Sequence, residues 1–423
     1  MLEFRKTKKV LVAIFLLALF LRLFKLGQYP EGFHVDEAKV AWNSLSIAET
    51  LVDDKLNKLP FYYDTFGDYR PTGIFYITAP FVVLFGNSVF AARFASALFG
   101  ALTIFPLYQL ATHFFPKKKK IGVFASLILA ILPWHISVSR GTSEVVISTF
   151  FMLYSIFFFL QLQKEKEIKY FYLSFLATLA SFALYHSARV LLPIYLIILA
   201  RWYIKKTNPK TTILIALIGI TAIFILLSPQ SQARLNQVSI FSSEDVVYEL
   251  KRSNEIKPVV YTRNIVEEYG KYFSLDFLIG EDAKPHRYLT LGVGLLNYVD
   301  VFLFLAGLYF LFLKKYPLSI LFLLMASPLA AIVTAEDSPN LHRAFYMAPF
   351  IALFEGIALY HVKNKKAVFT ILGLGLSYFL YSYFFKSTIR VPYQKGFSVE
   401  SPIYRNQGNI ELAKNLENAK GNY

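Results

Sequence analysis

Two acidic residues, Asp36 and Glu37, follow a turn marked by Pro30 and Gly32 and stand at the start of a predicted amphipathic helix. A carboxylate in such a position can cap the helix by accepting hydrogen bonds from its first free amides. It can equally act as a general base that takes the proton from an acceptor hydroxyl. For Asp36 the spacing leaves both interpretations open, and Glu37 is also explained as a first-turn charge favoured by the helix dipole.

A second group of candidates consists of arginines, most of them near a histidine or glutamate, in the loops and turns between apolar segments. Converging Arg or Lys donors bind a phosphate, and arginine can form two parallel hydrogen bonds to it. Taken singly, each residue is also explained as an interface anchor, and Arg140 with Glu144 as an i,i+4 ion pair. Arg70 fits either lipid phosphates in general or one specific phosphate. Because all of them fall on one predicted side of a membrane, together they favour an anionic lipid ligand. The group comprises Arg70, Arg140, Glu144, His186, Arg189, Arg287, His342 and Arg343.

The sequence also excludes several kinds of chemistry. It contains no cysteine, so disulfides, thiolate metal sites and cysteine nucleophiles are impossible. His34 reads as a loop residue, because no second His or carboxylate follows at a metal-ligand spacing on a predicted helix. A Walker loop, a dinucleotide fingerprint, a nucleophile elbow and an HExxH motif are all absent from the sequence. A nucleotide-dependent mechanism is therefore unsupported.

The elements that must position these residues are apolar segments long enough to cross a membrane. Of the 423 residues, 56% are hydrophobic and 17% are charged, compared with ~25% charged residues in a soluble domain. Apolar runs of about 20 residues predict an all-α polytopic membrane protein. The segment 74–85 is too short for a crossing, and we interpret it as an interfacial helix on the outer surface. The eleven predicted spans are 10–26, 91–115, 121–139, 145–162, 170–186, 190–204, 211–227, 294–313, 317–334, 344–361 and 367–385.

The net charge of +16 supports this topology and not nucleic-acid binding. With 74–85 outside the bilayer, the predicted inner segments hold 20 Lys and Arg but three acidic residues, as the positive-inside rule requires. The run Lys117–Lys120 is then an inner anchor. The chain is therefore predicted to lie in the inner or plasma membrane with its N-terminus in the cytoplasm. Residues 1–385 form the transmembrane domain, and its outer parts are the loops 27–90 and 228–293. The short tail 386–423 is also placed outside.

At these residues the chain resembles the family 39 glycosyltransferases of the GT-C architecture, which include protein O-mannosyltransferases and lipid A aminoarabinose transferases. Asp36-Glu37-Ala38-Lys39 is similar to the Asp-Glu pair in the first outer loop of the family, and Arg70-Pro71 to its basic-Pro-Pro element. The resemblance covers about residues 8 to 385. Further matching segments are Ala92–Gly100, Pro133–Glu144, His186–Arg189, Pro285–Arg287 and His342-Arg343.

The resemblance implies an inverting transfer of a sugar from a polyprenyl-phosphate-linked donor to an outer acceptor, which is a protein hydroxyl, a lipid or a glycan. It implies that Asp36 is the base and that Lys39, Arg70, Arg287 and Arg343 hold the donor phosphate. It requires no organic cofactor and leaves a divalent metal ion open. Such a donor already carries a good leaving group, which fits the missing nucleotide site.

Two departures from the family pattern bear on substrate identity. Lys39 stands where arginine is usual in the aminoarabinose branch, so the charge is kept but the bidentate fork is lost. Arg70-Pro71-Thr72 replaces the usual Lys-Pro-Pro. The donor sugar and the acceptor are left open for these reasons. Two rival hypotheses are a lipid-linked sugar flippase, which would use the same basic cavity without a base, and a polytopic assembly protein without catalysis.

Overall fold

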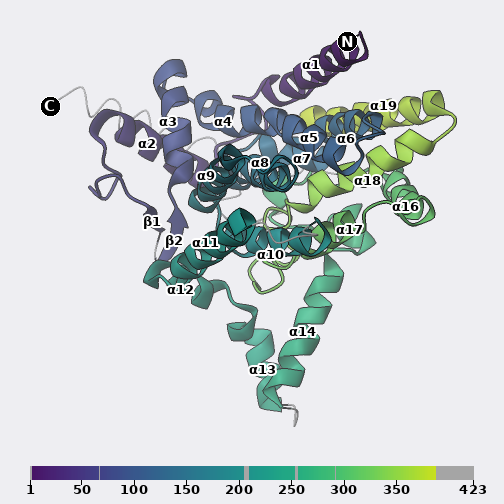
Figure 1. The fold of residues 1–423 in the computed structure, drawn as a ribbon. Coiled ribbons are helices and arrows are strands. Elements are labelled where there is room, and N and C mark those ends of the chain that lie inside the picture. Colours follow the sequence, from purple (N-terminus) through teal and green to yellow (C-terminus); the bar gives the residue numbers. More distant parts are fainter. Residues whose placement is uncertain (1, 66, 204–208, 253–255, 291, 387–423) are drawn as a thin grey trace.

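The computed structural model describes residues 2–65, 67–203, 209–252, 256–290 and 292–386. The described chain is predominantly helical, and the long helices lie side by side in one bundle (Figure 1). Of the predicted tail only Lys386 falls within the described residues. The longer helices are α1 (Leu2–Leu23), α2 (Val35–Thr50), α3 (Gly73–Phe85), α4 (Val89–Leu102), α5 (Ile104–Phe114), α6 (Lys120–Ile131), α8 (Glu144–Glu165), α9 (Ile168–Leu184), α10 (His186–Tyr203), α11 (Pro209–Leu226), α12 (Pro229–Val238), α14 (Lys257–Lys271), α16 (Tyr298–Leu313), α18 (Met347–His361) and α19 (Lys365–Tyr381).

Shorter elements join them. The two strands β1 (Tyr62–Thr65) and β2 (Asp68–Pro71) form an antiparallel hairpin in which Tyr63 is opposite Arg70. The remaining short helices are α7 (Pro133–Ser139), η1 (Ile240–Ser242), α13 (Glu244–Arg252), α15 (Leu275–Leu278), η2 (His286–Tyr288), α17 (Ser319–Ala326) and η3 (Ser382–Lys386).

Each predicted span coincides with a helix, but prolines divide two of them. Residues 121–139 form α6 and α7, which are bent by 56°, because Leu132 precedes Pro133 and adopts an extended conformation. Residues 317–334 hold only the eight-residue α17. Ser327 follows this helix directly and precedes Pro328, whose missing N–H and fixed φ disfavour continuation of the helix.

Four described helices are long and apolar enough to cross a membrane unaided, and the bent pair would make a fifth. The four are Val89–Phe114, Glu144–Glu165, Pro209–Leu226 and Lys365–Lys386. Four other apolar helices, among them α9 and α16, have 10–17 residues. The protein is therefore a multi-pass membrane protein, whereas the number of eleven crossings stays a prediction.

The core is centred on α18, which is buried on every side from Met347 to Leu359. Two glycines allow neighbouring helices to approach its backbone. A Cβ at Gly307 of α16 would collide with the main chain of Phe354, and a Cβ at Gly356 would lie 2.7 Å from the amide nitrogen of Ala125 in α6. Small residues at crossing points are how membrane helices gain close van der Waals packing.

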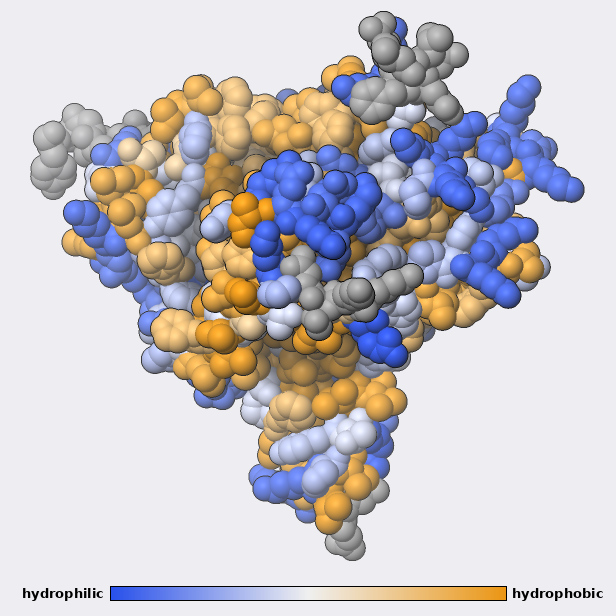
Figure 2. Space-filling view, viewed as in Figure 1, coloured by the Kyte–Doolittle hydropathy of each residue, from blue (hydrophilic) through white to orange (hydrophobic). Residues whose placement is uncertain are grey.

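The surface agrees with a lipid environment. Hydrophobic residues cover much of the face seen in Figure 2, interrupted by hydrophilic patches. Large apolar side chains are strongly exposed on three helices that carry predicted spans, for example Phe224 (78%) on α11, Phe302 (72%) on α16 and Leu374 (66%) on α19. Such side chains are stable only against another apolar phase. The helices α13 and α14 instead project away from the bundle (Figure 1).

Candidate active site

The start of α2 decides between the two interpretations of Asp36. The N-cap is His34 and not Asp36: His34 Nδ1 accepts the hydrogen bond from the Asp36 amide at 3.1 Å, and Glu37 Oε2 accepts from the His34 amide at 3.1 Å. This reciprocal arrangement is a capping box. The carboxylate of Asp36 is therefore not used to cap the helix, and His34 is a cap in place of the expected loop residue.

Glu37 fixes this helix start to the bundle. Arg93 of α4 donates to both of its oxygens, from Nε at 2.9 Å and from Nη2 at 2.8 Å. The Thr142 amide donates to Oε1 at 2.9 Å. Burial alone would raise the pKa of Glu37, but the ion pair with Arg93 and these hydrogen bonds lower it to about 2. Glu37 is thus a buried, fully bonded carboxylate that orients the residue beside it.

Asp36 lies between two arginines from distant segments. Its Oδ2 is 3.2 Å from Arg70 Nη1 in β2 and 3.3 Å from Arg287 Nη2 in η2. Arg287 Nη1 also lies 2.8 Å from His34 Nε2. Burial would raise the pKa of Asp36, but Arg70 and Arg287 outweigh it and hold the pKa well below its usual range. The carboxylate is therefore ionised and paired on one oxygen with two cations.

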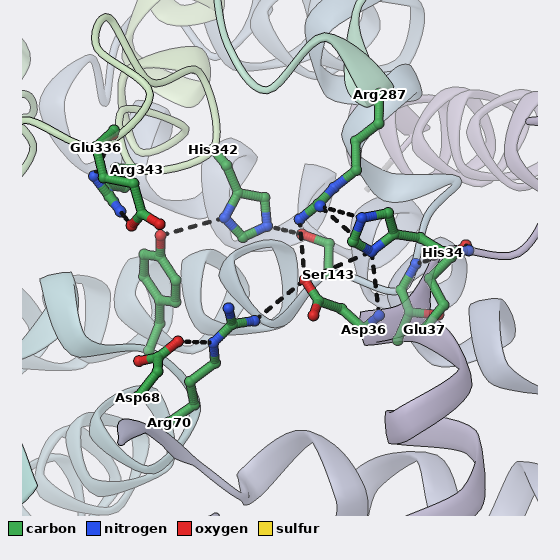
Figure 3. A network of polar contacts seen from close by, with 12 residues as sticks. His34, Asp36, Glu37, Asp68, Arg70, Ser143, Arg287, Glu336, His342 and Arg343 are labelled. Carbon is green, nitrogen blue, oxygen red and sulfur yellow. Dashed lines mark hydrogen bonds and ion pairs between the residues drawn. The ribbon is translucent and has the colours of Figure 1, made fainter. Parts of the chain in front are cut away.

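These side chains line one cavity of about 170 Å³, and Figure 3 shows how they converge on it. Seven of the residues singled out in the sequence line it. They come from the first outer loop, the start of α8, the start of α10, η2 and the segment before α18. The seven are Asp36, Arg70, Glu144, His186, Arg287, His342 and Arg343.

A chain of alternating charges continues from Asp36 along the cavity. Arg70 Nε donates to Asp68 Oδ2 at 2.7 Å, and Arg234 Nη1 lies 2.7 Å from Asp68 Oδ1. Arg234 and Arg343 both pair with Glu336, at 3.4 and 2.5 Å. The four arginines of the cavity are thus each joined to a carboxylate of the protein.

His342 is held by hydroxyl groups and not by a carboxylate. Its Nε2 lies 2.9 Å from Ser143 Oγ and its Nδ1 lies 3.2 Å from Tyr185 Oη. Its ring stacks on Tyr288 at a centroid distance of 5.3 Å. Burial, together with the nearby cations Arg287 and Arg343, lowers the pKa of His342 to about 3. The ring is therefore neutral and forms part of the wall of the cavity.

Two predicted arginines, Arg140 and Arg189, do not line the cavity. Their guanidinium groups instead donate hydrogen bonds to main-chain and hydroxyl oxygens. Arg140 is fully buried and donates to four carbonyls at the end of α1 and just beyond it, namely those of Leu21, Arg22, Phe24 and Tyr29, at 2.8–3.1 Å. Arg189 holds the β-hairpin against the bundle. It donates to Phe182 O, Tyr62 Oη and Ser231 Oγ and lies 3.0 Å from His186 Nδ1.

Lys39 and Glu37 also lie outside the lining of this cavity. The Nζ of Lys39 donates to the carbonyl of Asp64 at 3.4 Å and lies 5.0 Å from the ring centre of Tyr63. The residues that line the cavity without having been selected from the sequence include Arg234 and Glu336. Arg234 stands in a polar helix without a histidine beside it, so its sequence context gives no signal. Glu336 begins the turn that contains His342 and Arg343, and this proximity is a signal that could have been used.

Within the part of the chain that the structure describes, no group of three or more His, Cys, Asp or Glu side chains is arranged to hold a metal ion.

Residues 69–225 match the family model described as dolichyl-phosphate-mannose-protein mannosyltransferase. The matched region runs from β2 to the end of α11 and so includes Arg70, Glu144 and His186 of the cavity. Comparison with curated proteins finds no match.

Two groups of solved structures share the fold. The oligosaccharyltransferase AglB from Archaeoglobus fulgidus, in complex with an inhibitory peptide and a dolichol-phosphate, superposes with a TM-score of 0.53 at 12% identity over 90% of this chain. ArnT from Cupriavidus metallidurans, bound to undecaprenyl phosphate, superposes with a TM-score of 0.51 at 14% identity over 88% of this chain. The chain spans 55% of the AglB chain and 62% of the ArnT chain.

Proposed function

We propose that this chain is a membrane glycosyltransferase with a lipid-linked donor. It has the GT-C fold, and its resemblance to GT-C glycosyltransferases is confirmed. The observation that carries the proposal is the position of Asp36 between Arg70 and Arg287 in one cavity. A base beside two phosphate-binding cations is what sugar transfer from a phosphate-linked donor requires.

The donor class follows from the charges of the cavity. Arg70 and Arg287 are the donor-phosphate ligands, and Arg343 and His342 complete the polar wall. The two structural neighbours were solved with dolichol-phosphate and undecaprenyl phosphate, and both ligands are isoprenoid phosphates. We infer that the donor here is a polyprenyl-phosphate-linked sugar. The acceptor is a protein hydroxyl, a lipid or a glycan on the outer side.

The reaction is a single displacement in this proposal. The acceptor oxygen attacks the anomeric carbon of the sugar while the bond from that carbon to the phosphate oxygen breaks. The leaving phosphate keeps the bonding electron pair, and the arginines stabilise its charge. Asp36 takes the proton of the acceptor hydroxyl. The configuration at the anomeric carbon is inverted because only one displacement occurs.

Purified protein in proteoliposomes tests the proposal. A polyprenyl-phosphate-linked sugar carrying a radiolabel in the sugar is added together with envelope extract as acceptor. We expect labelled sugar to appear in the acceptor fraction while free polyprenyl phosphate accumulates in equal amount. Movement of intact donor across the bilayer without release of polyprenyl phosphate would instead identify a flippase and would contradict the proposal.

The pH dependence of turnover gives a second expected result. In the free protein Arg70 and Arg287 hold the pKa of Asp36 well below its usual range, so its base form persists to below about pH 4. A bound donor phosphate draws these cations away and adds a negative charge, and both effects raise the pKa of Asp36. We expect kcat to fall on acidification at a higher pH than kcat/KM, because kcat reports the donor complex. If initial-rate measurements show that kcat and kcat/KM fall at the same pH, this coupling is contradicted.

A further inference from the structure

The segment 51–61, which joins α2 to β1, presents large apolar side chains to the outside. We call it the knuckle. It lies at the edge of the molecule between the labels α2 and β1 in Figure 1. The exposed fractions are 50% for Leu51, 82% for Leu56, 46% for Leu59 and 85% for Phe61. Four such side chains within eleven residues of a polar loop are unusual for a surface in water.

Hydrogen bonds hold the knuckle in one shape. Val52 and Lys58 form an antiparallel bridge, and the Leu59 amide donates to the carbonyl of Leu51 at 2.9 Å. Inside the turn, the buried carboxylate of Asp53 accepts hydrogen bonds from the amides of Lys55 and Asn57 at 3.0 and 2.8 Å. The polar main chain is therefore bonded internally, and the apolar side chains are directed outward.

The three leucines of the knuckle adopt a backbone conformation that leucine rarely adopts. Their φ angles are 61° for Leu51, 64° for Leu56 and 45° for Leu59. Glycine or asparagine is the usual residue at such positions, because a Cβ is disfavoured there. Leucine at all three positions indicates that the side chains, and not the turn geometry, account for the choice of residue.

The knuckle is fixed at the level where a predicted span ends. The carbonyl of Pro60 accepts hydrogen bonds from Thr72 Oγ and Tyr76 Oη, so the knuckle is bonded to the first turn of α3. A Cβ at Gly73, at the same end of α3, would collide with the main chain of Ala183 near the end of α9. Phe61 therefore lies close to the end of α9 that is the predicted outer end of the span 170–186.

We propose that the knuckle inserts Leu56 and Phe61 into the outer-leaflet interface of the bilayer. A lipid surface suits it better than a flat protein surface, because its apolar side chains radiate from a compact turn. The long side chain of Lys58 is exposed beside them and can reach headgroup phosphates. The adjoining helix α3 also favours contact with lipid, since its far end exposes Val83 (62%) and Leu84 (71%).

Insertion of the knuckle would fix the depth of strand β2, which carries Arg70, relative to the bilayer. The Thr72 amide donates to the carbonyl of Phe61, and Lys55 pairs with Asp64 of β1 at 2.9 Å. Strand β1 in turn pairs with β2, which carries Arg70. The knuckle is thus connected through few bonds to an arginine of the cavity and would hold it at the depth of a lipid phosphate.

The absence of cysteine makes the depth of the knuckle directly measurable. Single variants Leu56→Cys and Phe61→Cys are labelled with a nitroxide and reconstituted in liposomes of phosphatidylglycerol and phosphatidylethanolamine. Collision rates with lipid-soluble oxygen and with a water-soluble nickel chelate then give the depth. Phe224→Cys on α11 is the lipid-facing control, and Glu244→Cys on α13 is the water-facing control.

We expect the ratio of the oxygen collision rate to the nickel-chelate collision rate to be several-fold higher at positions 56 and 61 than at position 244. This ratio should approach the value at position 224. Nickel accessibility at 56 and 61 equal to that at 244 would overturn the proposal and would leave a protein partner as the occupant. Because the measurement needs no turnover, its result does not depend on whether the proposed transfer reaction is correct.

Discussion

Replacing Asp36 by asparagine is expected to reduce sugar transfer by roughly 10²–10⁴-fold, the usual contribution of a general base. The amide of the introduced asparagine cannot take a proton from an acceptor hydroxyl. The side chain of Asp36 is 30% exposed in the cavity and does not cap α2, so the variant should fold. Initial rates of transfer in proteoliposomes at saturating donor measure the effect.

The matched control is Glu49→Gln. Glu49 lies on the same helix α2, its side chain is exposed, and it does not line the cavity. The same change of charge there should leave the rate nearly unchanged. Transfer by Asp36→Asn at the rate of this control would show that another group, with Glu144 of the same cavity as the next candidate, removes the proton.

The second large effect is expected on stability, from Glu37→Ala. Removing this carboxylate leaves the charge of Arg93 buried without its anionic partner, while its hydrogen bonds to the carbonyls of Leu26, Pro30 and Gly32 remain. Breaking one partner of a buried ion pair costs about 3–5 kcal/mol. The same change removes the acceptor for the Thr142 amide and one half of the capping box. Thermal unfolding in detergent, followed by tryptophan fluorescence, should therefore show a markedly lower midpoint than for the unmodified chain.

Glu37→Gln separates this positioning role from a direct catalytic role. The glutamine carbonyl still accepts a hydrogen bond from the Thr142 amide or from Arg93, so part of the stability should return together with transfer activity. If Glu37 contacted the reacting atoms, glutamine would abolish transfer while the unfolding midpoint stayed near that of the unmodified chain. That pattern would contradict the role assigned to Glu37 by its contacts.

The sequence predicted the helices well because apolar length is a property of each segment alone. Helix boundaries differed where proline intervened, at Pro133 and Pro328. The hairpin of β1 and β2 was not predicted, since its four-residue strands carry no clear alternation of apolar and polar residues. The buried face of α2 includes the polar residues Asn43 and Ser44 beside Val40, Ala41 and Ile47. An amphipathic pattern does not predict their burial, which arises because α3 and α4 pack against this helix.

The candidate site was predictable to the extent that charged residues at membrane ends converge on cavities. This argument brought Asp36, Arg70, Arg287 and Arg343 together although they are far apart in the sequence. It could not distinguish an arginine that faces the cavity from one that binds carbonyl groups. Arg140 and Arg189 have the same local context as the others, and only the tertiary structure shows that they bind main-chain and hydroxyl oxygens outside the cavity lining.

The alternating chain from Arg287 through Asp36, Arg70, Asp68, Arg234 and Glu336 to Arg343 bears on discrimination between ligands. Each arginine already has a carboxylate, so an incoming anion must displace an existing partner before it gains one. Inorganic phosphate or a free nucleotide gains little from such an exchange. A phosphate attached to a long hydrocarbon chain would bring additional binding energy from its tail in the bilayer, so we expect a cavity whose arginines are already paired to discriminate against the small anions that surround every cell.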